Sequence, residues 1–120
     1  MKNDLKDRTK KFSLQIINFI ELLPKKLAAS IIAKQLVRSA TSVGANYRAV
    51  CRARSDKEFI AKMNIVLEEA DESCFWLELI SEENWLNKDI VFPILKESNE
   101  LIAIFVSTLK TINARVNKTS

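Results

Sequence analysis

The chain has 120 residues, of which 48% are hydrophobic and 28% charged, with one glycine and two prolines. At this length folding hides about two-thirds of the unfolded surface, so we expect one domain, residues 1–120, that needs neither metal nor disulfide to fold. The lack of histidine excludes catalytic triads that need this base, and Cys51 and Cys74 form no CxxC pair that would bind zinc.

The net charge of +4 is unevenly distributed along the chain. Residues 1–62 hold 14 Lys and Arg against 5 Asp and Glu, whereas residues 63–120 hold 5 against 10. This split predicts one basic and one acidic side. The sequence contains no apolar run of about 18 residues and no secretion signal, which predicts a soluble cytoplasmic protein without a membrane segment. Both cysteines are expected to be small core residues in a reducing compartment.

The helical spacing of apolar residues predicts two long helices in the first half of the chain. The first begins at Asn3 or Asp4 and ends before Pro24, and the second covers residues 27–53. Gly44 lies inside the second pattern. Because a glycine in a helix costs about 1 kcal/mol relative to alanine, close approach of a neighbouring helix explains it better than a break.

Two further helices are predicted in the second half. Ser55 and Glu58 have the spacing of a capping box, which places the start of a helix there. After a polar break at residues 81–88, a last helix begins between Asp89 and Pro93 and runs to about Arg115, with a frayed tail at residues 117–120. Four amphipathic helices with short connections predict an all-α, up-and-down antiparallel four-helix bundle.

A basic stripe is the first candidate functional feature. It lies on the second helix within an arc of roughly 80° and consists of Lys34, Arg38, Arg48 and Arg52. One interpretation is a nucleic-acid-binding face that follows several phosphates. The other is a solvated face that pairs with acids of the third helix, in the same or a neighbouring subunit. The prevalence of arginine slightly favours recognition of phosphate or carboxylate groups.

A second stripe lies on the third helix and includes Ile65, Glu69, Glu72 and Trp76. Its two large apolar residues, Ile65 and Trp76, lie outside the apolar stripe by which this helix is expected to face the core, so we predict an oligomer interface here. The alternative is that Trp76 covers the end of the bundle within one chain. The acids of this helix do not predict a metal site, because carboxylate sites in bundles need Glu-x-x-His pairs.

Catalytic motifs are missing from the sequence. A single glycine excludes phosphate-loop and dinucleotide-binding motifs, and a lone Ser or Cys without a positioned base is a weak nucleophile. We therefore predict a protein that is not an enzyme and holds no cofactor or metal. An enzyme with an unrecognised site would need a concave polar pocket.

Three segments are informative together, namely Gln35 to Arg48, residues 52–60 and residues 72–77, and the Arg-Ser-Ala-Thr-Ser-x-Gly-Ala-Asn core of the first is distinctive. These segments resemble the bacterial four-helix bundle proteins also called S23 or 23S rRNA intervening-sequence proteins, from Arg8 to Ile102. The resemblance implies a homopentameric ring of four-helix bundles, without established enzymatic activity for most members.

A related branch comprises the accessory variability proteins of diversity-generating retroelements, which are basic pentamers that bind nucleic acid and a reverse transcriptase. This chain has Ala49-Val50 where the family commonly has an acidic residue, which raises the basic character beside Arg48 and Arg52. Together these observations predict a homo-oligomer, with RNA, DNA or a nucleic-acid-processing protein as partner. The alternative is a structural or protein–protein scaffold whose charges serve only subunit assembly.

Overall fold

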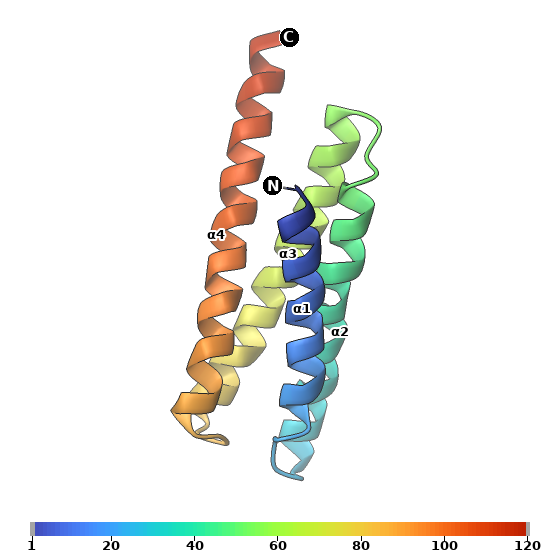
Figure 1. Ribbon diagram of the computed structural model, residues 1–120. Helices are drawn as coiled ribbons and strands as arrows, with labels where there is room; N and C mark the ends of the chain where they lie inside the picture. The colour runs from blue at the N-terminus through green and yellow to red at the C-terminus, as the bar shows by residue number, and fades with distance from the viewer. Residues whose placement is uncertain (1, 120) are drawn as a thin grey trace.

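The computed structural model describes the backbone of residues 2–119 and the side chains of residues 4–118. This part of the chain forms four helices, which are α1 (Lys2–Ile20), α2 (Leu27–Val50), α3 (Asp56–Glu82) and α4 (Lys88–Thr119). They run up and down as consecutive antiparallel neighbours (Figure 1). The predicted all-α four-helix bundle is therefore confirmed.

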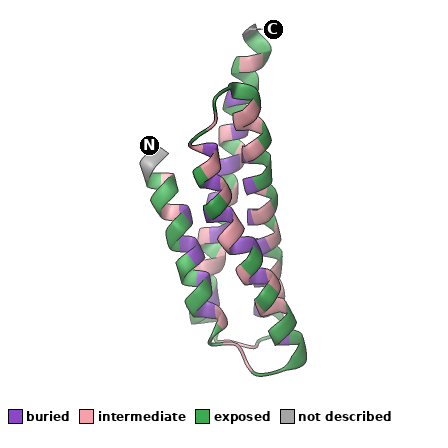
Figure 2. Ribbon diagram, turned by 90° about the vertical axis from the view of Figure 1, so that its right-hand side faces the viewer, coloured by how far each residue is buried: buried purple, intermediate pink, exposed green. Residues whose placement is uncertain are grey.

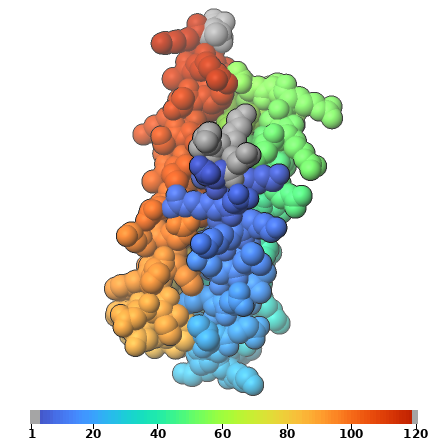
Figure 3. Space-filling view, in the orientation of Figure 1, coloured from blue at the N-terminus to red at the C-terminus, as the bar shows by residue number. Residues whose placement is uncertain are grey.

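The helices do not pack equally. The helix α2 packs along both α1 and α3, and α3 packs along α4, but α1 and α4 contact each other much less. Part of their contact is electrostatic, because Arg8 donates two hydrogen bonds of 2.7 Å to Glu97 and one of 3.0 Å to Glu100. The C-terminal part of α4 rises beyond α1, as the space-filling view shows (Figure 3). The bundle is thus elongated, at 52 × 23 × 21 Å.

All four helices contribute one side to a shared apolar core (Figure 2). Its largest fully buried side chains include Phe12, Ile16, Leu36, Met63, Leu77, Leu101 and Phe105. Burying each such side chain contributes about 1.5–3 kcal/mol, which stabilises the bundle without any metal or disulfide. Cys74 is buried as predicted, whereas Cys51 is only partly buried and packs against the edge of the core.

The first two helices end earlier than predicted. After Ile20 the chain continues in turns, in which the amides of Leu22 and Leu23 donate to carbonyls three residues back. The residue before a proline avoids helical dihedrals, so Pro24 affects the preceding turn and not only its own position. The helix α2 also ends before its predicted boundary, at Val50, and the chain continues in turns in which the Arg52 and Ala53 amides donate to carbonyls three residues back.

The later boundaries follow local capping. Ser55 is the N-cap of α3 and accepts a 3.1 Å hydrogen bond from the Glu58 amide, as the capping-box spacing predicted. The helix α4 begins one residue before the predicted range, because the Asn87 side chain accepts from the Asp89 amide. The helix also continues past Arg115 to Thr119, since no glycine or proline follows to stop it. The predicted frayed tail is helical as far as it is described, and Ser120 lies outside the described residues.

Gly44 allows α2 to approach α1 closely, as its place in the apolar pattern predicted. A Cβ atom at this position would lie 2.8 Å from the Ser13 Oγ and 3.4 Å from the Thr9 carbonyl oxygen. The Ser13 hydroxyl donates across the same contact to the Ala40 carbonyl, at 2.8 Å. The close packing of these two helices therefore depends on the missing side chain.

Candidate nucleic-acid interface

The structure places three of the four predicted cations on α2 and the fourth just beyond it. Lys34, Arg38 and Arg48 are exposed on α2, whereas Arg52 lies two residues past its end. The Arg52 amide donates to the Ala49 carbonyl at 3.1 Å, which keeps the chain turning beyond the helix. Arg48 and Arg52 consequently line one groove, although they do not belong to one helix.

Arg38 is engaged within its own chain. Its guanidinium donates to Glu69 of α3 at 3.3 Å and also to Glu72, and the Trp76 indole donates to the same Glu72 carboxylate at 3.0 Å. Arg38 therefore pairs with two third-helix acids of the same chain. A phosphate would have to compete with two carboxylates at this position.

The Glu72 carboxyl is sensitive to this arrangement. Partial burial raises its pKa, but hydrogen bonds from Trp76 and Arg38, together with the charge of Arg38, outweigh burial and hold the pKa below its ordinary value. Because the folded-state pKa is the lower one, the linked stabilisation is present above the unfolded pKa and is lost as pH falls through the folded pKa.

We therefore expect Arg38→Gln to lower the urea midpoint at neutral pH, and to have a smaller effect once the pH falls through the lowered folded-state pKa of Glu72 and its carboxylate is protonated. Urea titrations of the wild type and the variant, at neutral pH and at a pH where Glu72 is protonated, measure how far the midpoint falls at each pH. In a Glu72→Gln background, the effect of Arg38→Gln should lose most of its pH dependence. A destabilisation that is equally large in acid would contradict this role for Glu72.

A basic groove lies between the C-terminal end of α2 and the N-terminal part of α3. Its cations are Arg48, Arg52, Arg54 and Lys62, and we call this pocket the basic groove. The groove has a volume of about 580 Å³, and Glu58 is the one carboxylate among its lining residues. Within residues 4–118, none of its four cations has a carboxylate at ion-pair distance.

Small side chains lie between the cations of the groove. Ala45 and Ala49 line it beside Arg48. Ala49 is one of the two positions where relatives were expected to carry an acid, so the alanine leaves the groove more positive than an acidic residue would. Small residues here also leave room for a ligand backbone to approach α2.

Two lysines of α1 flank the other side of α2. The Cα atom of Lys10 lies only 3.7 Å from the position of a Cβ atom on Gly44. Because α1 and α2 are antiparallel, one further turn along each helix brings Lys6 level with Arg48. Lys6, Lys10 and Arg48 are all exposed. We call Lys6 and Lys10 the α1 lysine pair.

Sequence reasoning missed the α1 lysine pair, Arg54 and Lys62 as parts of one surface. These residues lie on α1, in the α2–α3 connection and on α3, so helical spacing within α2 could not find them. The available signal was the concentration of positive charge in residues 1–62.

The outer face of α3 carries the predicted interface residues. Ile65 is 46% exposed, and Phe75, which the sequence analysis did not single out, is 50% exposed. Trp76 is partly buried and meets Phe75 edge to face, with ring centroids 5.2 Å apart. Glu69 and Glu72 lie on the same helix, held by Arg38. The oligomer interface at these residues stays a prediction.

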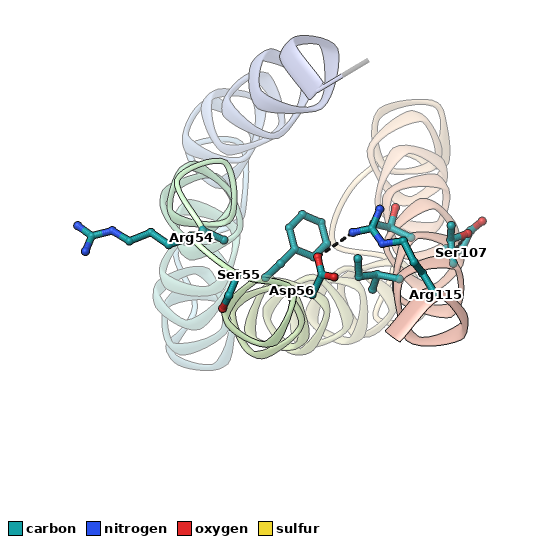
Figure 4. A pocket seen from close by; sticks show the side chains of 10 residues that line it. Arg54, Ser55, Asp56, Ser107 and Arg115 are labelled. Atoms are coloured by element: carbon teal, nitrogen blue, oxygen red, sulfur yellow. Dashed lines mark hydrogen bonds and ion pairs between the residues drawn. The ribbon is translucent and has the colours of Figure 1, made fainter. Parts of the chain in front are cut away.

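A second pocket, of about 540 Å³, lies between the start of α3 and the C-terminal half of α4 (Figure 4). Arg115 donates to Asp56 at 2.7 Å across it, and Arg54 points away from this pair. The Thr108 and Thr111 hydroxyls donate to backbone carbonyls one turn back in α4. These polar groups are therefore paired with one another or with the backbone, and they do not form a nucleophile with a positioned base.

None of the helices, within the part of the chain that is described, carries an apolar stretch long enough to cross a membrane.

The comparisons with known proteins agree with the fold. The 23S rRNA-intervening sequence protein family matches residues 1–107. The chain belongs to this family. A crystal structure from Bacteroides thetaiotaomicron, of a protein with unknown function from the S23 ribosomal protein family, is 34% identical. It superimposes with a TM-score of 0.81 over 88% of this chain and 98% of that one. No curated protein matches the chain. The family resemblance inferred from residues 35–48, 52–60 and 72–77 is thus confirmed.

Proposed function

We propose that this member of the 23S rRNA-intervening sequence protein family is a non-enzymatic, cytoplasmic homo-oligomer that binds the phosphate backbone of nucleic acids. The basic groove and the α1 lysine pair form the contact surface. Lys34, about 21 Å from Arg48 along α2, and the partly neutralised Arg38 are outlying contacts.

One observation carries the proposal. Arg48 and Arg52 have no carboxylate partner among the described residues, whereas Arg38 on the same side of α2 has two. Charges that served only the stability of the single chain would gain from such partners, as Arg38 does. An unpaired cluster of arginines beside small side chains instead suits phosphate groups, which guanidinium binds through two parallel hydrogen bonds.

The salt dependence of binding tests the proposal. Phosphate contacts release counterions, so the logarithm of affinity should fall linearly with the logarithm of salt concentration. If all four cations of the basic groove contact phosphates, the slope should be about −2.8 on single strands and about −3.6 on duplex DNA. Fluorescence anisotropy with labelled RNA and DNA of several sequences measures it. Lack of binding at low salt, or binding that salt leaves unchanged, would contradict the proposal and favour a scaffold whose charges serve assembly.

We further propose that the outer face of α3 joins subunits through Ile65, Phe75 and Trp76, in the pentameric ring that the family resemblance implies. Two of these side chains are about half exposed, and burying aromatic residues is a main source of interface affinity.

Light scattering should then give a mass well above the 13.7 kDa of one chain, and Phe75→Asp should lower it. Phe92 of α4 is exposed to a similar extent, at 52%, so Phe92→Asp is the matched control and should keep the mass. A wild-type protein that is monomeric at micromolar concentration would disprove the interface.

A further inference from the structure

We infer that the basic groove and the α1 lysine pair together are shaped for double-helical nucleic acid, duplex DNA or duplex RNA, in preference to single strands. This inference deepens the proposed function and depends on it.

The cations around α2 are arranged in two rows. The helix α2 packs against α1 on one side and α3 on the other, so it forms a ridge with a cation row on each flank. The α1 lysine pair forms one row, and Arg54 and Lys62 form the other. Neighbouring packed helices lie about 8–10 Å apart, so the two flanks are separated by more than one helix diameter.

A duplex can occupy both flanks at once. It presents two phosphate backbones on either side of a groove, about 12 Å wide for the major groove and about 6 Å for the minor groove of B-DNA. The outer face of α2 would lie over the groove at Ala45 and Ala49, whose small side chains permit this approach. A single strand has one line of phosphates and can follow only one flank.

The aromatic residues lie away from these cations. Proteins that bind single strands stack bases on exposed aromatic side chains. All nine aromatic residues of this chain lie elsewhere than in the basic groove. Four are buried in the core, and Phe59 lines the pocket beside α4. Phe75 and Trp76 lie on α3, Trp85 lies in the α3–α4 connection, and Phe92 lies on α4. The surface offers charge and shape but no stacking platform.

Anisotropy titrations with a short DNA duplex, the RNA duplex of the same sequence and their separated strands test the inference. The variant Lys6→Glu/Lys10→Glu removes the α1 flank. On a duplex it should lower the salt slope by about 1.8 and weaken binding about 60-fold near 0.1 M salt, because two contacts are lost. On single strands, which follow the basic groove, the slope should change little.

The control Lys25→Glu/Lys26→Glu changes the same number of exposed charges in the α1–α2 connection, at the opposite end of α1, and should leave both affinities nearly unchanged. Circular dichroism verifies folding, and Lys6→Gln/Lys10→Gln repeats the test without introducing acids.

Binding of only one duplex type would identify it as the ligand class. Equal affinity for strands and duplexes, or equal weakening of both by the α1 variants, would overturn the inference while leaving the proposed function intact. Failure to bind any nucleic acid would instead disprove the proposed function itself.

Discussion

Reversing Arg48 and Arg52 to glutamate is expected to weaken nucleic-acid binding on all sequences alike. Two lost phosphate contacts should lower the salt slope by about 1.4 to 1.8, depending on strandedness, and the two new carboxylates add repulsion at the centre of the basic groove. The effect should be large because neither arginine has a carboxylate at ion-pair distance among the described residues, so both charges are available to phosphate groups.

The matched control is Lys96→Glu/Lys110→Glu, which makes the same change in net charge on exposed positions of α4. It should bind nearly as tightly as the wild type. Light scattering on both variants separates the proposal from the scaffold alternative, in which reversal disrupts assembly across subunits. A double mutant that keeps full binding while its mass falls would show that Arg48 and Arg52 are structural.

Replacing Gly44 with alanine is expected to destabilise the protein, even though alanine favours helices by about 1 kcal/mol. The new Cβ would lie 2.8 Å from the Ser13 Oγ, so the serine must rotate away from the Ala40 carbonyl or the two helices must separate. Overpacking typically costs about 1–3 kcal/mol and a lost hydrogen bond about 1 kcal/mol, which after subtraction of the helix gain predicts a net loss of about 1–3 kcal/mol.

Urea denaturation at one fixed protein concentration measures this loss, since assembly would make stability depend on concentration. The double variant Gly44→Ala/Ser13→Ala removes the obstructing hydroxyl and should recover most of the stability relative to Gly44→Ala. Ser13→Ala alone reports the cost of the hydrogen bond. An unchanged or raised midpoint for Gly44→Ala would show that the glycine has no packing role.

Much of the fold could be predicted because its signals are local. The apolar residues repeat with the helical period, and the Ser55 cap needs only a residue three positions away. Gly44 was also interpretable, because a glycine inside an amphipathic helix is costly unless packing requires it. The helix ends were less predictable, since Pro24 and Asn87 act through turns whose hydrogen bonds extend over neighbouring residues.

The amino-acid sequence by itself determined that four amphipathic helices form and that the cations of α2 lie toward one side. Tertiary structure alone decided which of these cations are available. Glu69 and Glu72 are more than thirty residues from Arg38 and reach it only because α3 packs antiparallel to α2. The same packing brings Lys62 and Arg54 beside Arg48 and Arg52, and the close approach at Gly44 brings Lys10 beside α2. Charge neutralisation depends on distance in space, which helical periodicity within one segment does not encode.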